Sequence, residues 1–341
     1  MGVKLKDILQ PTPITLEELS HKIIAVDAYN MLYQFITTIR MRDGTPLKNS
    51  KGQPTSHLVG LLSRTSNFLE HQIKPVFIFD GESPKLKEAE QERRAQAKTA
   101  AKKKHAQASA SGDVEGMKKY AGRTAKLTKE MIAESKQLLE ALGVPWIQAP
   151  AEAEAQAAVL VRRGDADYVA SQDMDCLLFG APRMIKNLSI TGKRKRPGTN
   201  SYYTIQPEII HLEAELARLE LSQKQLILLA MLVGTDFNPS GIRGIGPKTA
   251  LKKVHEHGED AQKLFADVEW EEHNDVSWQE VLRVLQEMPT ANDYEITWQA
   301  PNPDQLHKLL VDEFEFSAER VNNTANKLVR AQQQKGLRDY F

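Results

Sequence analysis

The stretch KIIAVDAYNMLYQFITTIR, residues 22–40, contains the structural unit from which the fold is built. Its first part is a continuous apolar run that ends at Asp27, which is typical of a short β-strand buried on both faces. The part after Asp27 places apolar residues at helical spacing and predicts an α-helix. A strand followed directly by a helix is the repeating unit of α/β proteins with parallel sheets.

Three further apolar runs repeat this pattern. They are KPVFIFDG (74–81), ALGVPWIQAP (141–150) and ADYVASQD (166–173), and segments with helical periodicity separate them. The chain has 341 residues, of which 41% are hydrophobic and 26% charged, so it is long enough to bury a substantial core. We therefore expect an α/β fold with a mostly parallel central sheet flanked by helices.

Acidic side chains follow the predicted strands. Asp27, Asp80 and Asp173 are each expected at the last position of a strand. Ligands of open α/β sheets bind beyond the carboxyl ends of the strands, where these three side chains would meet. A single Asp at such a position is often only a helix N-cap. Three at equivalent positions favour a metal site over capping alone.

Four more acids are predicted to reach the same edge of the sheet. Asp175 lies two residues after Asp173, Glu152 and Glu154 lie where a helix is predicted to begin, and Asp236 follows a buried helix. The alternative for the two glutamates is stabilisation of the helix dipole. Residues two apart do not share a helix face. One of the pair is therefore expected to act from the non-helical lead-in or through a water.

So many acids at one site indicate bound cations. Carboxylates near an apolar strand are costly to desolvate unless positive charge offsets the cost, and hard divalent cations prefer oxygen ligands. Two-metal hydrolases hold their ions about 3.5–4 Å apart. The single cysteine, Cys176, excludes a cysteine-based zinc site and is expected to be a small buried hydrophobe.

The charges of the chain are unevenly distributed, although 45 Lys and Arg balance 45 Asp and Glu. Residues 85–130 contain 13 basic and 6 acidic residues, whereas residues 256–320 contain 17 acidic and 4 basic residues. Such a basic segment is typical of a nucleic-acid binder, although a charge run alone is more often a solvated surface. The longest apolar run, residues 226–234, is about half the roughly 20 residues needed to cross a bilayer. With no predicted signal peptide, we expect a soluble intracellular protein without membrane contact.

The segment GIRGIGPK, residues 241–248, is predicted to be a glycine-spaced turn that opens a helix. Exposed backbone N–H groups and Lys248 would suit it to hold a phosphate without reading a base. The alternative is an ordinary tight turn. The preceding Asp236 and the following KTALKKV favour the phosphate interpretation.

The motifs VDAYNMLYQF, FIFDG, APAEAEAQ, SQDMDCLLFG, LVGTDFNPSGIRGIGPK and QKGLRDYF, in this order, resemble those of the flap endonucleases. These are structure-specific 5′ nucleases of DNA replication and repair, and the resemblance covers essentially the whole chain. It implies a PIN-like 5′ nuclease fold with a helical arch and a helix-two-turn-helix element. It also implies a monomer that cuts branched DNA at 5′ flaps, with 5′–3′ exonuclease activity, in Okazaki fragment maturation and base excision repair.

The resemblance also implies roles for individual residues. Two Mg²⁺ ions, for which Mn²⁺ can substitute, would be held by Asp27, Asp80, Glu152, Glu154, Asp173, Asp175 and Asp236. Lys87 and Arg94 would contact the scissile phosphate, and Tyr33 would stack on a base. From the residues alone, Lys87 and Arg94 are equally well an exposed helix face, and Tyr33 is better explained as a core residue. Further DNA contacts are implied for Arg40, Thr55, Lys102, Lys103, Lys104, Gly244, Gly246, Lys248, Phe316 and Arg320.

The resemblance divides the chain into one nuclease domain and a tail. The nuclease domain is 1–330, with an N-terminal region 1–84, gateway and cap helices 85–130, an internal region 131–255 and a C-terminal helical region 256–330. The cap has scarcely any large apolar residues, so we expect it to order on substrate. The GIRGIGPK turn would belong to the helix-two-turn-helix, with a bound K⁺, and residues 316–320 to a pocket for a one-nucleotide 3′ flap.

The segment 331–341 is expected to be a flexible tail that contains a sliding-clamp peptide. Gln334, Leu337, Tyr340 and Phe341 follow the pattern Q-x-x-L-x-x-aromatic-aromatic and resemble the peptide with which replication proteins bind that ring. The alternative is a disordered polar terminus, which leaves the two aromatic residues unexplained.

The location and two other functions remain open from sequence. The chain resembles archaeal members of the family, so we expect it in the cytoplasm at the nucleoid. The run GKRKRP, residues 192–197, could instead be a nuclear import signal in a eukaryote. An RNA-cleaving nuclease of the same fold would need the acids but not the duplex grip and the clamp peptide. A non-catalytic clamp-bound DNA scaffold would be expected to have lost some of the seven acids.

Overall fold

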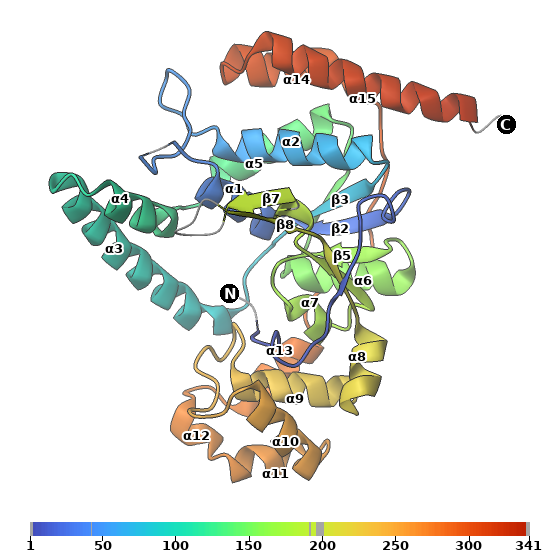
Figure 1. The fold of residues 1–341 in the computed structure, drawn as a ribbon. Coiled ribbons are helices and arrows are strands. Elements are labelled where there is room, and N and C mark those ends of the chain that lie inside the picture. Colours follow the sequence, from blue (N-terminus) through green and yellow to red (C-terminus); the bar gives the residue numbers. More distant parts are fainter. Residues whose placement is uncertain (1–2, 42, 191, 196–200, 339–341) are drawn as a thin grey trace.

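The computed structural model describes residues 3–41, 43–190, 192–195 and 201–338. The described strands form a seven-stranded sheet, in the order β1-β9-β6-β5-β2-β3-β4, and a two-stranded hairpin, β7-β8 (Figure 1). The strands are β1 Thr12–Pro13, β2 Ile23–Asp27, β3 Lys74–Phe79, β4 Trp146–Gln148, β5 Tyr168–Ala170, β6 Arg183–Lys186, β7 Gly192–Lys195, β8 Tyr202–Ile205 and β9 Glu208–His211.

Five neighbouring strands of the sheet, from β6 to β4 in the order above, are parallel. β2 pairs in parallel with both β3 and β5, β3 with β4, and β5 with β6. β9 and β1 complete one edge in antiparallel orientation. The predicted mostly parallel α/β sheet is therefore confirmed, and the carboxyl ends of β3, β2 and β5 lie next to one another.

Helices cover both faces of this sheet (Figure 1). The first half of the chain contributes α1 Ala28–Thr38, α2 Ser56–Glu70, α3 Glu88–Ala110, α4 Val114–Ala121, α5 Lys129–Ala141, α6 Ala153–Arg163 and α7 Asp175–Leu178. The second half contributes α8 Leu212–Leu219, α9 Gln223–Val233, α10 Pro247–His257, α11 Ala261–Asp267, α12 Trp270–His273, α13 Trp278–Gln286, α14 Pro303–His307 and α15 Ala318–Arg338. Shorter helical turns are Lys85–Lys87, Gly122–Thr124 and Leu188–Ile190, and a π-helical turn spans Lys308–Glu313.

Alternation along β2 explains why two cores form. Ile24 and Val26 point into the core that α1, α2, α5 and α15 cover, whereas Ala25 points into the core that α6, α7 and α9 cover. All three side chains are fully buried. A strand buried on both faces reads as a continuous apolar run, which is the pattern seen at residues 22–27.

The predicted strand ends are correct to different degrees. β2 ends at Asp27 as predicted, and Asp80 directly follows β3. The prediction for Asp173 was wrong, because β5 ends at Ala170, three residues earlier. Side chains end the strand there: Gln172 N donates to Asn30 Oδ1 at 3.3 Å, and Asp173 N donates to Ser171 Oγ at 3.2 Å.

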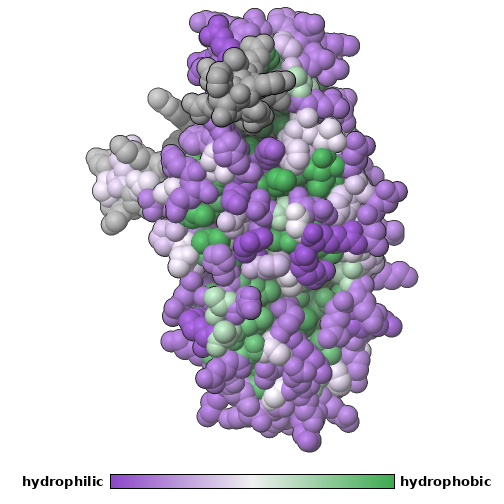
Figure 2. Space-filling model, turned by 90° about the vertical axis from the view of Figure 1, so that its right-hand side faces the viewer, coloured by the Kyte–Doolittle hydropathy of each residue, from purple (hydrophilic) through white to green (hydrophobic). Residues whose placement is uncertain are grey.

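The basic segment of the chain forms the helical pair α3 and α4. The two helices extend from one side of the molecule, on the left in Figure 1. On the opposite face, which Figure 2 turns toward the viewer, the visible side chains are mainly hydrophilic, with apolar side chains in separate groups. No described helix combines the length and the apolar character that crossing a membrane would require.

The expected clamp peptide lies only partly within the described residues. Helix α15 continues through Arg338, so Gln334 and Leu337 lie on helical backbone. Tyr340 and Phe341 lie outside the described residues, as do residues 196–197 of the basic run GKRKRP.

Candidate active site

Asp27 is a helix cap and also a member of the acidic cluster. Its Oδ1 accepts a hydrogen bond from Asn30 N at 2.9 Å at the start of α1, and Ser171 Oγ lies 3.3 Å from its Oδ2. Burial, together with the neighbouring charge of Asp80, raises the pKa of Asp27 to about 8. Capping and cluster membership are therefore not alternatives at this position.

Asp80 joins the end of β3 to the start of α6. Its Oδ1 accepts a hydrogen bond from Ala153 N at 2.7 Å. Two segments of the backbone approach each other closely here, since a Cβ on Gly81 would lie only 2.1 Å from the carbonyl oxygen of Ala149. Burial and the charge of Glu152 raise the pKa of Asp80 to about 6.

Glu152 and Glu154 lie on either side of the first residue of α6. Glu152 is the N-cap, with extended backbone angles (φ −83°, ψ 131°), and Glu154 lies in the first helical turn. This confirms that one of the pair belongs to the non-helical lead-in. Burial, followed by the charges of Asp27 and Asp175, raises the pKa of Glu154 well above its usual value.

Asp173 and Asp175 are held by segments that lie far away in the sequence. Asp173 Oδ2 accepts a hydrogen bond from Asn30 Nδ2 at 2.9 Å, and Asp175 Oδ1 accepts one from Val3 N at 2.7 Å. Burial raises the pKa of Asp175 to about 7, and the charges of Asp236 and Asp173 contribute. The N-terminal segment thus reaches the site, a contact that the sequence pattern did not indicate.

Two cationic side chains from the foot of α3 lie against these acids. The Lys87 ammonium donates to the Glu152 carboxylate, and its Nζ lies 3.3 Å from Asp236 Oδ2. Burial alone would lower the pKa of Lys87, but the charges of Glu152, Glu154 and Asp236 outweigh it and raise the pKa. Arg94 Nη2 donates to both oxygens of Asp236, at 2.8 and 2.9 Å.

Sequence reasoning missed Glu90, which orients Arg94. Glu90 is 2% exposed and accepts hydrogen bonds from Arg93 Nε at 2.6 Å and Arg94 Nε at 2.7 Å. The signal was present as an acid three and four residues before two arginines, a spacing that brings side chains together on a helix. Sequence reasoning also missed Asn30, which lies three residues after Asp27 and donates a hydrogen bond to Asp173.

The donor set fits hard divalent cations. The seven acids offer only carboxylate oxygens, and burial raises the pKa values of four of them, Asp27, Asp80, Glu154 and Asp175, so nearby positive charge would favour their ionised forms. Within the described ranges, no three carboxylates form a ready ligand group for one ion. Lys87 and Arg94 instead supply positive charge at Glu152 and Asp236, which limits repulsion between the acids.

Tyr33 is not a core residue, so that interpretation was wrong. It is 38% exposed, and Lys98 Nζ of α3 lies 5.5 Å from the centroid of its ring. The core face of α1 is formed instead by Met31, Leu32 and Phe35. The helical rotation between Leu32 and Tyr33 turns the tyrosine away from the sheet.

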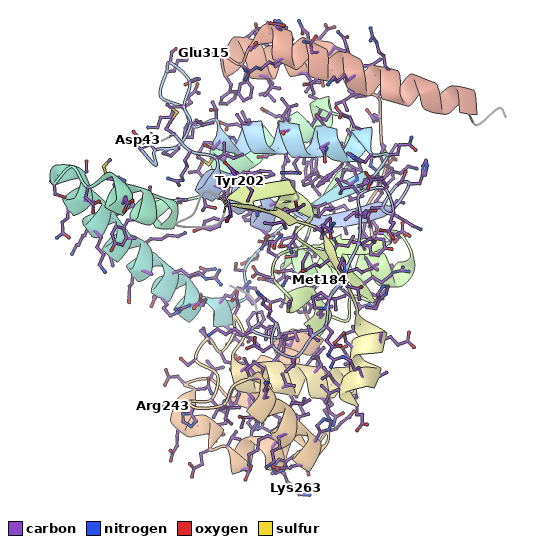
Figure 3. All side chains as sticks on the ribbon, in the orientation of Figure 1. Asp43, Met184, Tyr202, Arg243, Lys263 and Glu315 are labelled. Atoms are coloured by element: carbon purple, nitrogen blue, oxygen red, sulfur yellow. The ribbon has the colours of Figure 1, made fainter. Side chains whose placement is uncertain are left out.

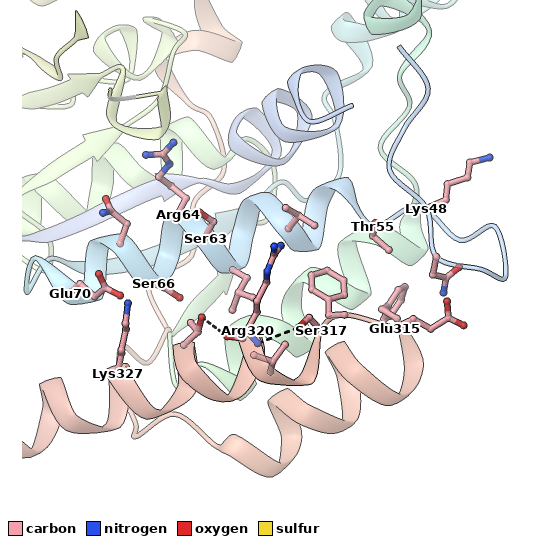
Figure 4. Close-up of a pocket in the computed structure, with 18 residues that line it drawn as sticks. Lys48, Thr55, Ser63, Arg64, Ser66, Glu70, Glu315, Ser317, Arg320 and Lys327 are labelled. Atoms are coloured by element: carbon pink, nitrogen blue, oxygen red, sulfur yellow. Dashed lines mark hydrogen bonds between the residues drawn. The ribbon is translucent and has the colours of Figure 1, made fainter. Parts of the chain in front are cut away.

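A groove between α2 and α15 brings together three residues for which DNA contacts were expected, two of them from the segment 316–320 expected to bind a 3′ flap. Thr55, Phe316 and Arg320 all line this cavity of about 730 Å³ (Figure 4). Arg40 does not line it: its Nε donates to Ile36 O at 2.9 Å and its Nη1 to Gly44 O at 2.8 Å. The structure thus shows Arg40 holding the chain that leads from α1 toward α2.

The turn before α10 leaves its backbone accessible. Gly244 has φ 83°, and Gly246 is the N-cap of α10, where Pro247 occupies the first turn. A Cβ on Gly244 or Gly246 would meet no atom within 4 Å, so a ligand can approach the backbone closely. Lys248 follows in the first turn, and Arg243 in the turn lies on the same side of the molecule as α3 and α4 (Figure 3).

The three arch lysines are exposed on α3. Lys102, Lys103 and Lys104 all face solvent, and Lys104 Nζ lies 5.8 Å from the centroid of the Tyr120 ring on α4. On α3 they lie more than two helical turns beyond Arg94, which contacts the acidic cluster through Asp236. Their position is compatible with contacts to nucleic-acid backbone and with a solvated helix face.

Comparison with known proteins identifies the family. The XPG N-terminal domain model matches residues 1–101, and the XPG I-region model matches residues 143–236. The chain is 46% identical to flap endonuclease 1 of Staphylothermus marinus, over 97% of this chain and 95% of that protein. It is 45% identical to that of Pyrococcus abyssi, over 100% of this chain and 98% of that protein.

Solved structures agree with the sequence comparison. Flap endonuclease-1 from Methanococcus jannaschii superposes with a TM-score of 0.76 at 37% identity, covering 98% of this chain and all of that one. The catalytic core of Rad2 in complex with DNA substrate superposes with a TM-score of 0.68 at 25% identity, covering 96% and 100%. The chain belongs to the flap endonuclease 1 family.

Proposed function

We propose that this flap endonuclease family member hydrolyses a phosphodiester near the base of 5′ DNA flaps in a Mg²⁺-dependent reaction. The products would carry 5′-phosphate and 3′-hydroxyl ends. The observation that supports this best is the convergence of acids from β2, β3, α6 and α7 at the carboxyl edge of the sheet. Lys87 and Arg94 of the arch contact two members of that cluster, Glu152 and Asp236.

The seven carboxylates would hold the metal ions. Asp27, Asp80, Glu152, Glu154, Asp173, Asp175 and Asp236 supply only oxygen donors, which favours Mg²⁺, with Mn²⁺ as a substitute. The chemistry that two bound ions supply in such hydrolases is activation of a water and stabilisation of the leaving oxygen. The raised pKa values of Asp27, Asp80 and Asp175 support the need for that positive charge.

Lys87 and Arg94 would bind the scissile phosphate. Both side chains now pair with carboxylates, and a phosphate offers them the same kind of anionic oxygen. Positive groups fixed at this point stabilise charge that develops on the phosphate during hydrolysis. Tyr33, exposed on α1 and facing α3, would stack on a base beside it.

Three elements would hold the branched DNA. The α2–α15 groove, lined by Thr55, Phe316 and Arg320, would take a single 3′ nucleotide. The turn with Gly244, Gly246 and Lys248 would grip duplex backbone, with a K⁺ at the helix-two-turn-helix, and Lys102, Lys103 and Lys104 would contact the single-stranded flap. Arg40 would add a DNA contact from the α1–α2 connection.

The remaining functional assignments rest on the family and the sequence. We propose action in replication and repair in an archaeal cell, as a monomer at the nucleoid, with 5′–3′ exonuclease activity in addition to flap cleavage. Gln334, Leu337, Tyr340 and Phe341 would dock on the sliding clamp, with Leu337 and the two aromatic side chains as apolar anchors.

Cleavage of matched substrates tests the proposal. A DNA flap, a linear single strand and an RNA hairpin of equal length would each be incubated with the protein, with Mg²⁺ and with EDTA. We expect cleavage of the flap near its base only when Mg²⁺ is present. Preferred cleavage of the hairpin would favour the RNA nuclease, and binding without cleavage of any substrate would favour the scaffold.

A further inference from the structure

Two acids of the proposed metal site are joined by a closed ring of hydrogen bonds. Asn30 N donates to Asp27 Oδ1 at 2.9 Å, and Asn30 Nδ2 donates to Asp173 Oδ2 at 2.9 Å. On the other side, Asp173 N donates to Ser171 Oγ at 3.2 Å, and Ser171 Oγ donates to Asp27 Oδ2 at 3.3 Å. We call these four residues, Asp27, Asn30, Asp173 and Ser171, the Asp27–Asp173 ring.

Asn30 contacts the carboxylates of both acids in this ring. Its backbone N–H lies in the first turn of α1, which Asp27 caps, and its side chain reaches the loop after β5. Gln172 N donates to Asn30 Oδ1 at 3.3 Å, so the same amide also holds the backbone next to Asp173. One side chain therefore contacts both the carboxylate of Asp173 and the loop that carries it.

The partners of the Asn30 amide determine its orientation. A backbone N–H can only donate, so the amide oxygen must face Gln172 N. The amide nitrogen then faces the carboxylate of Asp173, which accepts when it is ionised, and hydrogen bonds to ionised groups are the stronger ones. Asn30 thus has a single orientation in which both of these partners are satisfied.

The donor from Asn30 to Asp173 differs in kind from the donors to other acids of the cluster. Asp27, Asp80 and Asp175 each accept a hydrogen bond from a backbone N–H. Such bonds do not depend on the side chain at the donating position. The bond to Asp173, in contrast, requires a donor side chain at position 30, so its contribution can be tested by substitution.

We infer that Asn30 is a positioning residue that orients Asp173 relative to Asp27 for metal binding. This inference rests on the proposed function, in which both acids are Mg²⁺ ligands. Groups that hydrogen-bond to metal ligands fix the orientation of those ligands, and their loss typically costs about 10–100-fold in metal affinity or activity. A ring that is closed before the ion arrives also reduces the ordering that binding requires. Because Asn30 acts through Asp173, its loss should change the requirement for Mg²⁺ rather than the affinity for DNA.

Two substitutions of Asn30 and one control isolate this role. Asn30→Leu removes both side-chain hydrogen bonds but keeps the size of the side chain and is favourable in a helix. Asn30→Asp keeps an acceptor for Gln172 N and places a carboxylate oxygen where the amide donated to Asp173. Gln34→Leu is the matched control, because Gln34 is also half-buried on α1, one helical turn further on, and accepts its hydrogen bond from Ser189 Oγ.

Binding of Mg²⁺ alone is the primary measurement, by titration calorimetry and by the rise in Tm that Mg²⁺ produces relative to EDTA. For Asn30→Leu we expect Mg²⁺ to bind about tenfold more weakly or worse, and Tm to fall more with Mg²⁺ than in EDTA. The Mg²⁺ concentration for half-maximal single-turnover flap cleavage should rise by a similar factor. The dissociation constant of the flap in EDTA should stay unchanged, and Gln34→Leu should match the parent throughout.

A double substitution tests whether Asn30 acts through Asp173. In an Asp173→Ala background, Asn30→Leu should weaken Mg²⁺ binding little further, because the carboxylate that it orients is already gone. Asn30→Asp in the parent should also weaken Mg²⁺ binding, because two carboxylates then repel each other at the position where an amide donated.

Several results would overturn the inference while leaving the proposed function intact. These are parental Mg²⁺ binding in Asn30→Leu, an equal loss in Gln34→Leu, a full additional loss in the double variant, or tighter Mg²⁺ binding in Asn30→Asp, which would indicate a direct ligand at this position. A fall in Tm that is equal with Mg²⁺ and with EDTA would show that Asn30 only stabilises the fold.

Failure of the proposed function would look different from failure of this inference. The parent protein would then show no binding of Mg²⁺ and no Mg²⁺-dependent cleavage of the flap. If Asn30→Leu did not fold, Asn30→Asp would decide by the same calorimetric comparison with the parent and with Gln34→Leu.

Discussion

Arg94 Nη2 on α3 lies 2.8 Å from Oδ1 and 2.9 Å from Oδ2 of Asp236, a residue 142 positions further along the chain that lies just after α9. The ion pair ties the foot of the basic arch to the acidic cluster. It thereby brings the element proposed to bind flaps to the groups proposed to cut them. Glu90 supports the contact by accepting from Arg94 Nε at 2.7 Å.

Replacing Arg94 should affect the chemical step more than DNA binding. We expect Arg94→Ala to reduce the single-turnover cleavage rate by about 10²–10³, the usual cost of losing one group that stabilises developing charge. Arg94→Lys should recover part of that loss. Arg93→Ala is the control, because Arg93 donates to Glu90 and, among the described residues, hydrogen-bonds to none of the seven cluster acids. Equal losses in Arg93→Ala and Arg94→Ala would refute a specific role for Arg94.

Replacing Asp173 should separate catalysis from binding. We expect Asp173→Ala to reduce turnover by orders of magnitude, because a proposed metal ligand is lost. Flap affinity should stay the same or increase, since one negative charge near the phosphate is removed. Rates at saturating Mg²⁺ and dissociation constants in EDTA would be measured in parallel. Turnover near that of the parent would exclude Asp173 as a ligand.

The raised pKa values predict how the metal-free protein responds to pH. Folding raises the pKa of Asp27 to about 8 and that of Asp175 to about 7, from 3.8 for an unperturbed Asp. At pH values between the unperturbed pKa of 3.8 and these raised values, the folded state binds more protons than the unfolded state. The contribution of these groups to the free energy of unfolding therefore falls as pH rises from about 4 to 8.

Thermal unfolding checks this dependence. In EDTA, Tm should decrease between pH 5 and pH 8, and Mg²⁺ should restore it most at pH 8, where the carboxylates need positive charge most. Asp175→Asn removes one titrating group and should flatten the dependence in EDTA. A parent and variant with the same pH dependence would show that Asp175 does not titrate in this range.

The arch lysines should contribute sequence-independent binding. Replacing Lys102, Lys103 and Lys104 by Gln should weaken binding of flaps of different sequence alike. The slope of log K against log salt should decrease by about 0.7 for each lost single-strand contact. Lys263→Gln, on the exposed surface of α11, is the control and should leave the slope unchanged. An unchanged slope in the triple variant would identify the lysines as a solvated helix face.

The C-terminal aromatic residues should affect only clamp stimulation. Tyr340→Ala combined with Phe341→Ala should leave clamp-free flap cleavage unchanged and abolish stimulation by the cognate clamp. Tethering to a ring around DNA raises the local enzyme concentration without adding a catalytic contact. Stimulation would be measured at limiting enzyme, and equal stimulation of variant and parent would assign these residues another purpose.

The sequence by itself determined the type of fold and the kind of chemistry. Runs such as residues 22–27 are apolar without interruption because β2 is buried on both faces, and that pattern is local. The positions of Asp27 and Asp80 at the ends of β2 and β3 were readable for the same reason, whereas Asp173 lies three residues beyond the end of β5. Helical geometry also indicated that Glu152 and Glu154 cannot share a helix face, although it left open whether one of them acts from the non-helical lead-in or through a water.

Only the tertiary structure decided which groups meet. Asp175 with Val3, Arg94 with Asp236, and Glu315 with Ser50 join segments separated by 172, 142 and 265 residues. No periodicity encodes such pairs, because they depend on how the elements pack against one another. The exposure of Tyr33 and the early end of β5 depend likewise on neighbouring side chains, whereas local patterns record only whether a residue favours burial.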